Sequence, residues 1–139
     1  AHLQLLSESL IRRAGLDSAL REESYEQALS CLQELMARGQ APFAVRQNTA
    51  LVLEYLGRFE EAEEVLLQLQ EDFPQDYRPP MRLALLYADR EGNRTAGERD
   101  YTEFETAYRQ AVQLYDPSAA PDSEMTRLEE LAAQLGLSP

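Results

Sequence analysis

The stretch from Asn48 to Pro74 constrains the fold more than any other part of the chain. Its apolar residues recur every three to four positions on both sides of Leu56-Gly57-Arg58, which predicts two amphipathic helices joined by a tight turn. Glycine commonly ends a helix, and proline cannot continue one. No segment alternates apolar and polar residues as a strand does, and β-branched residues are few. The sequence therefore predicts an all-α fold.

The same spacing predicts further helices on both sides of this stretch. Ser24 is expected to cap one of them, Pro42 to open the next, and Asp122 or Ser123 to cap the last. Residues 89–99 are polar and contain glycine, so we expect a loop there. The expected helices are residues 3–22 (one kinked helix or two short ones), 24–38, 42–56, 59–71, 78–88, 100–115 and 122–136.

The helix pairs recur at a fixed interval. Unit starts at Ser9, Phe43 and Tyr77 lie 34 residues apart, and self-similarity at such a period is typical of a solenoid. The middle unit carries a small residue in its first helix, an aromatic after the turn, another small residue three positions later and a final proline. These residues are Ala50, Phe59, Ala62 and Pro74.

In these positions the chain resembles the tetratricopeptide repeat (TPR) family. Tyr25 and Ala28 match in the first unit. The third unit matches at Leu83, Ala84, Tyr87, Tyr101, Phe104, Tyr108 and Ala111. The resemblance implies one domain over residues 1–139, a TPR-like right-handed α-solenoid of three helix pairs plus a C-terminal capping helix. Its parts are repeats at 9–42, 43–76 and 77–117, the last with a loop insertion at 91–99, and a capping helix at 122–136.

The third unit also resembles the C-terminal helical-repeat segments of some bacterial serine/threonine protein kinases. The residues that carry this likeness are 76–84, 99–101 and 122–125. The likeness implies a non-catalytic part of a larger bacterial signalling protein, for which we expect a cytoplasmic location. The chain begins at Ala1 rather than at a methionine, which also suggests a piece of a longer protein.

Charge and composition narrow the class of function. The chain has 13 basic and 25 acidic residues, a net charge of -12, which disfavours nucleic acid and anionic membranes as partners. No apolar run is long enough to span a bilayer. Cys31 and His2 are the only residues of their types, and lysine is absent. Cys31 is expected to be a small buried filler. We expect no catalytic activity, no metal and no cofactor, because nucleophile–base pairs and metal-ligand clusters are missing.

The TPR resemblance implies that the first helix of each pair lines a concave binding groove. The predicted binding residues are Arg13, Asn48, Tyr55, Arg78 and Arg82. One TPR subgroup clamps the C-terminal carboxylate of a chaperone peptide, and four of these residues (all but Tyr55) stand at positions of that clamp. Asp17 stands where the subgroup has Asn and would repel a carboxylate. The alternative is that the arginines only pair with neighbouring glutamates on an acidic surface.

We therefore expect a protein–protein interaction scaffold that binds a peptide or a neighbouring domain, with acidic or C-terminal carboxylate groups as one candidate ligand. The alternative is a structural or oligomerisation module that packs on its parent protein or on itself through apolar surface. Asp89, Glu91, Asn93, Thr95 and Asp100 have a spacing like that of a calcium loop, but Arg94 stands where such a loop needs glycine. We expect a solvated loop there instead, or a contact site.

Overall fold

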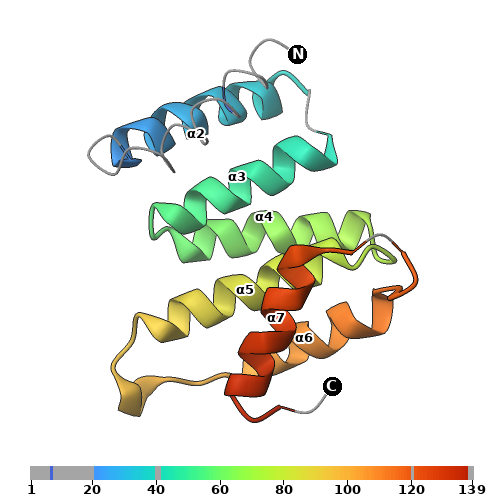
Figure 1. Ribbon diagram of the computed structural model, residues 1–139. Helices are drawn as coiled ribbons and strands as arrows, with labels where there is room; N and C mark the ends of the chain where they lie inside the picture. Colours follow the sequence, from blue (N-terminus) through green and yellow to red (C-terminus); the bar gives the residue numbers. More distant parts are fainter. Residues whose placement is uncertain (1–6, 8–20, 40–41, 120, 138–139) are drawn as a thin grey trace. The chain divides into compact units, whose positions relative to one another are not determined.

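The computed structural model describes residues 7, 21–39, 42–119 and 121–137. Within this part of the chain every regular element is helical, as Figure 1 shows, which confirms the all-α expectation. The elements are α2 (Arg21–Ala37), α3 (Phe43–Tyr55), α4 (Phe59–Asp72), α5 (Arg78–Gly92), the short 3-10 helix η2 (Ala96–Glu98), α6 (Thr102–Leu114) and α7 (Ser123–Gln134). Most of the helix expected over residues 3–22 lies outside the described residues, and its last two positions belong to α2.

The chain divides into two compact units, residues 1–65 and 66–139. In the first unit α2 packs against α3. The apolar stripe of α2 is buried as predicted, at Tyr25, Ala28, Leu29, Leu32 and Leu35. The prediction that Ser24 caps this helix is wrong, because α2 already includes Arg21 and Ser24 is buried inside it. The first turn holds Glu22 and Glu23, whose charges favour a helix N-terminus.

Helix α3 begins next to a proline and ends at a glycine turn, as predicted. Pro42 is the residue before its first helical position. Gly57 follows its last turn and has a φ of 76°. This left-handed conformation is strained for residues with a Cβ. It lets the Gly57 and Arg58 N–H groups donate to the carbonyls of Glu54 and Leu53, which satisfies the end of the helix.

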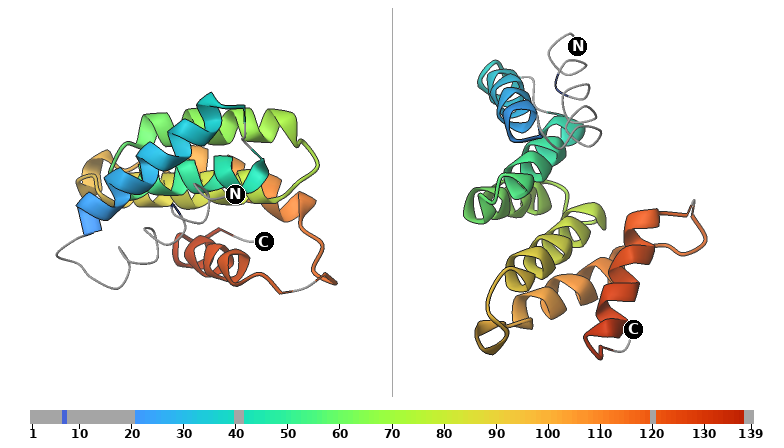
Figure 2. Two further views of the ribbon diagram at one scale, coloured as in Figure 1. Left: turned by 90° about the horizontal axis from the view of Figure 1, so that it is seen from above. Right: turned by 60° about the vertical axis from the view of Figure 1, so that its left-hand side comes forward.

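The second unit is built around α5. Residues 81–87 are all buried, and α5 packs against both α6 and α7, which Figure 2 shows from two further directions. Pro79 and Pro80 lie in the first turn, where a missing N–H breaks no helical bond. The apolar faces of α6 and α7 complete this core with Phe104, Ala107, Tyr108, Ala111, Met125, Leu128 and Ala132.

Two predicted boundaries in this unit need correction. Helix α5 continues to Gly92, so residues 89–92 are helical rather than part of the expected loop. Helix α6 begins at Thr102, not at Asp100. The Asp100 carboxylate instead accepts hydrogen bonds from the N–H and hydroxyl of Thr102, at 3.0 and 2.6 Å, and this turn leads into α6. The last helix begins as predicted, with Asp122 accepting from the N–H groups of Glu124 and Met125.

Candidate interaction surfaces

Two of the predicted binding residues, Asn48 and Tyr55, lie on α3 in the first unit. Asn48 is half-buried in the middle of the helix. Tyr55, its last residue, has 49% of its surface exposed, and its ring lies 4.9 Å from the ring of Tyr25 on α2. Tyr55 therefore offers an aromatic face beside a helix–helix contact, an arrangement common in protein-binding surfaces. Arg13 lies outside the described residues.

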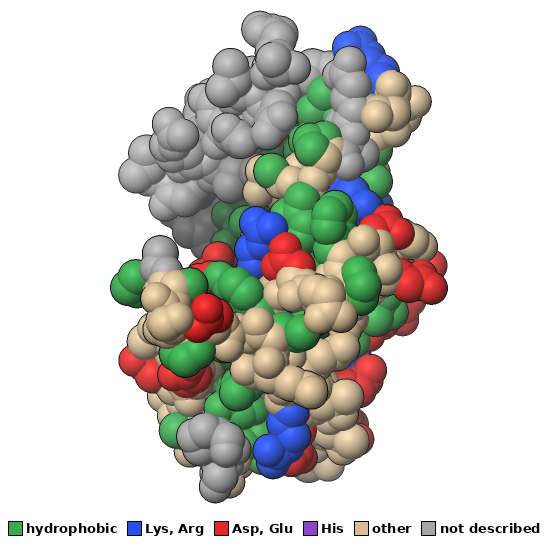
Figure 3. Space-filling view, turned by 90° about the vertical axis from the view of Figure 1, so that its right-hand side faces the viewer, with side chains coloured by type: hydrophobic (Ala, Val, Ile, Leu, Met, Phe, Trp, Pro, Cys, Tyr) green, Lys and Arg blue, Asp and Glu red, His purple; other side chains and the backbone are tan. Residues whose placement is uncertain are grey.

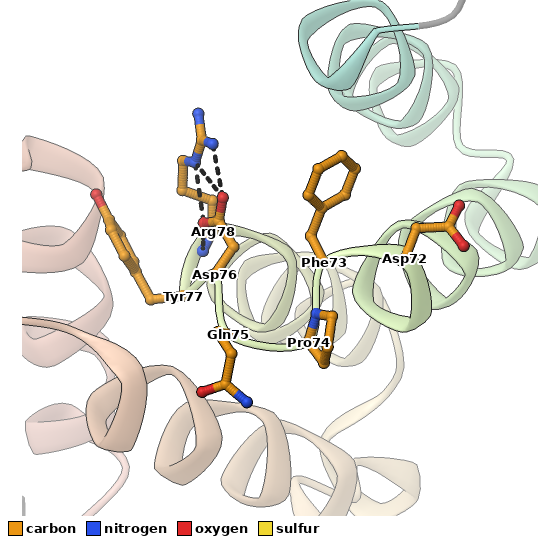
Figure 4. A pocket seen from close by; sticks show the side chains of 7 residues that line it. All are labelled: Asp72, Phe73, Pro74, Gln75, Asp76, Tyr77 and Arg78. Carbon is orange, nitrogen blue, oxygen red and sulfur yellow. Dashed lines mark hydrogen bonds and ion pairs between the residues drawn. The ribbon is translucent and has the colours of Figure 1, made fainter.

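Arg78 lies at the turn between α4 and α5, on a hollow of about 640 Å³ lined by residues 72–78. Its Nε lies 3.0 Å and its Nη2 2.6 Å from the two carboxylate oxygens of Asp76. Figure 4 shows Arg78 and Phe73 pointing to the same side of this turn, while Gln75 points to the opposite side. The Arg78 guanidinium lowers the pKa of the Asp76 carboxyl, and the pair keeps opposite charges together. An external carboxylate would compete with Asp76 here.

Arg82 is buried against the second unit's own C-terminal helix. Its guanidinium pairs with the carboxylate of Glu124 in the first turn of α7, and only 8% of the Arg82 side chain is exposed. A buried charge that loses its partner is costly, so an outside carboxylate would first have to displace Glu124. The described geometry therefore gives no support to a carboxylate clamp at Arg82. It agrees with the alternative that the arginines pair with acidic neighbours.

A second contact fixes the start of α7 to the start of α5. The Tyr77 hydroxyl donates to the Asp122 carboxylate at 2.5 Å, and the Tyr77 ring meets that of Tyr115 edge to face at 4.9 Å. Burial, with the hydrogen bond to Asp122, raises the pKa of Tyr77 to about 12. Burial opposes ionisation of Asp122. The hydrogen bonds from Tyr77 and from the helix N–H groups outweigh it and keep the pKa of Asp122 below its ordinary value.

The expected solvated loop contains a buried carboxylate. Glu91 is 0% exposed, and its oxygens accept from Arg90 Nε at 2.7 Å, Arg94 Nη1 at 3.1 Å and the Asp100 N–H at 2.9 Å. The Asp100 N–H contributes most to lowering the pKa of Glu91, and the two arginines add to it. Glu91 therefore joins the end of α5 to the segment before α6. The expectation of a fully solvated loop is wrong at this residue.

A groove in the second unit was not predicted. It holds about 210 Å³ and is lined by residues of α4, α5 and α6. Its apolar surface comes from Leu67, Leu83, Tyr87 and Ala107, and its polar rim from Gln70, Thr102, Glu103, Thr106 and Gln110. Leu67 is 47% exposed although the leucine before it is buried. The sequence signal that could have indicated this groove is Leu67, an apolar residue that lies off the packing stripe of the acidic helix α4.

The described residues contain neither a cluster of metal ligands nor a helix that could cross a membrane. There, no group of three or more His, Cys, Asp or Glu residues is placed to hold a metal ion. No described helix is both long enough and apolar enough to cross a membrane. Figure 3 shows hydrophobic, basic and acidic side chains interspersed on the lower part of one face. Cys31 is half-buried beside the stripe of α2, not fully buried as expected.

Comparisons with protein families, with curated proteins and with solved structures gave no match for this chain. The TPR and kinase resemblances therefore stay predictions that rest on the residues quoted for them.

Proposed function

We propose that the chain is a non-catalytic protein-interaction module built from TPR-like helix pairs, the last of them covered by α7. The support is a recurrence in burial. Three residues of α2 and the residues 34 positions later in α4 are all buried, and the same holds for one residue each of α3 and α5. The pairs are Ala28 and Ala62, Leu32 and Leu66, Leu35 and Leu69, and Ala50 and Ala84. Shared burial at one interval is what stacked repeats require.

The observation that carries the binding function is the groove between α4, α5 and α6. Helical repeats present a surface of side chains to a partner, and a groove with an apolar floor and a polar rim resembles the composition of protein interfaces. Its volume, about 210 Å³, is below the roughly 300–1,000 Å³ of small-molecule sites. It therefore suits one or two side chains of a protein segment. Tyr55 of the first unit remains a further proposed contact.

Peptide display tests this function without a known partner. The whole chain should enrich related peptides from a random library. The affinity of the protein for these peptides should fall in at least one of the variants Leu67→Ser and Tyr55→Ala. Leu135→Ser is the matched control, since Leu135 is 36% exposed at the end of α7 and does not line the groove. A library without any enriched peptide would count against the proposal.

The second candidate is a structural module that packs on its parent protein or on itself. It is favoured by exposed apolar side chains in the first unit, Tyr55 and Met36. Light scattering over a range of concentrations separates the two functions. Self-association that Tyr55→Ala abolishes, together with failed peptide display, would favour the structural module.

A further inference from the structure

We propose that the groove between α4, α5 and α6 binds an apolar side chain from a basic amphipathic segment of another protein. This inference rests on the proposed function and specifies the partner's chemistry.

The first argument is the shape of the groove. Leu83, Tyr87 and Ala107 are nearly buried and form its floor, while Leu67 stands at its edge with 47% of its surface exposed. An apolar side chain inserted here would cover Leu67 and remove apolar surface of both partners from water. Recognition of an amphipathic helix by a groove uses anchors of this kind.

The second argument is charge. Glu103 is the only ionisable carboxylate among the lining residues, and its side chain is 58% exposed. Glu71, one turn after Leu67 on α4, is also exposed. Arg90 lies nearby, with its guanidinium carbon 4.9 Å from the centre of the Tyr87 ring, but it already pairs with Glu91 and Glu103. The carboxylates near the groove thus outnumber the arginine, so basic groups beside the anchor are favoured.

The net charge of the chain also disfavours binding of a second copy or of an acidic segment in the groove. Each copy of the chain carries a net charge of -12, so a second copy or an acidic segment would meet long-range repulsion as it approached the groove. A basic segment would be attracted instead. An external basic partner is therefore favoured over self-association through this surface.

The probe is a synthetic capped peptide with leucines spaced one helical turn apart and arginines beside them. Its counterpart has glutamates in place of the arginines. Binding is measured by fluorescence anisotropy on the whole chain and on the Leu67→Ser variant. Leu135→Ser is the control, because it makes the same substitution outside the groove and leaves the net charge unchanged. We expect the arginine peptide to bind, with its affinity reduced by about tenfold in Leu67→Ser and unchanged in Leu135→Ser, because Leu67→Ser removes apolar surface at the groove edge that the inserted side chain would cover. Amide shifts in an NMR titration should centre on Thr106 and Gln110.

Equal affinity in Leu67→Ser and wild type, equal binding of the glutamate peptide, or no binding of the arginine peptide would each overturn the proposal. So would a dimer in light scattering that Leu67→Ser abolishes. Circular dichroism checks that both variants fold, which is expected because Leu67 and Leu135 are exposed. If display yields peptides whose binding ignores Leu67, this inference fails while the proposed function stands. If display yields none, the proposed function fails.

Discussion

Glu91 shows how one buried charge can organise a connection between helices. A carboxylate removed from water is costly unless its oxygens are paired. Here one oxygen accepts from Arg90, and the other accepts from Arg94 and from the N–H of Asp100. Arg99 adds bonds to the carbonyls of Glu91 and Gly92. The polar composition of this segment therefore reflects internal pairing rather than a free loop.

Glu91→Gln should lower the free energy of unfolding by about 1–3 kcal/mol, because two arginines and an N–H lose a charged acceptor. Urea denaturation at neutral pH measures this loss. The matched control is Glu103→Gln, which removes a largely exposed partner of Arg90 and should cost about 0–1 kcal/mol.

The effect of Glu91 has a defined pH dependence. Its pKa is lowered in the fold, so its contribution is complete above the ordinary glutamate pKa of about 4.3 and is lost as pH falls through the lower folded value. The difference between wild type and Glu91→Gln should shrink in that acidic range. A difference that stays constant to low pH would mean that the charge of Glu91 is unimportant.

The contribution of Tyr77 to the free energy of unfolding should have the opposite pH dependence. Because its pKa is raised from 10.0 to about 12, the neutral hydroxyl is favoured in the fold. Tyr77→Phe should cost about 1–2 kcal/mol through loss of the bond to Asp122. The advantage of tyrosine should be constant below about pH 10 and should decrease as pH rises toward 12, measured by urea denaturation at several pH values. A stability difference between wild type and Tyr77→Phe that stays constant up to about pH 12 would contradict this role of the Tyr77 hydroxyl.

At the scale of the helices, two glycines should respond to the same substitution with opposite signs. Gly57 has a φ of 76°, whereas Gly92 is the last helical residue of α5, and an added Cβ would contact nothing at either position. Gly57→Ala should therefore cost about 1–2 kcal/mol through backbone strain alone. Gly92→Ala should stabilise the protein by about 0.4–1 kcal/mol, because alanine has fewer unfolded conformations to lose. Thermal unfolding compares the two. A loss of stability in Gly92→Ala would show that the end of α5 depends on glycine.

Most helices could be predicted because their signals are local. The stripe of α2, the turn at Gly57 and the cap at Asp122 each follow from residues within a few positions of one another. The end of α5 was missed because its polar residues 89–92 resemble a loop until Glu91 is known to be buried. That burial depends on Asp100, a residue from beyond the intervening turn.

The candidate sites were less predictable because they depend on contacts distant in sequence. The TPR resemblance placed Arg82 on a binding face, but its partner Glu124 lies 42 residues further along the chain. Only the packing of α7 on α5 brings the two together. The groove likewise needs three helices to meet, and Leu67 alone gave only a weak signal as an apolar residue among glutamates.

At the scale of the whole molecule, the net charge of -12 links stability to binding. Like charges repel in the compact chain, and salt screens them: the screening length falls from about 10 Å at 0.1 M to about 3 Å at 1 M. Raising sodium chloride from about 0.05 to about 0.5 M should therefore raise the unfolding temperature. The same change should weaken binding of the arginine peptide, because screening also reduces its attraction to the groove.

The response of the unfolding temperature to salt distinguishes repulsion among the acidic side chains from stabilisation by local ion pairs. If local pairs such as Arg78–Asp76 and Arg109–Glu105 dominated stability, salt would lower the unfolding temperature instead. Asp76→Asn tests this at one pair: it removes one negative charge together with the partner of Arg78. Because the Arg78 side chain is 44% exposed and the Asp76 side chain 21% exposed, the pair is partly solvated, and we expect a loss of about 1 kcal/mol and an unchanged sign of the salt effect. Salt that lowers the unfolding temperature of the wild type but raises that of Asp76→Asn would show that this single pair outweighs the repulsion among the acidic side chains of the whole chain.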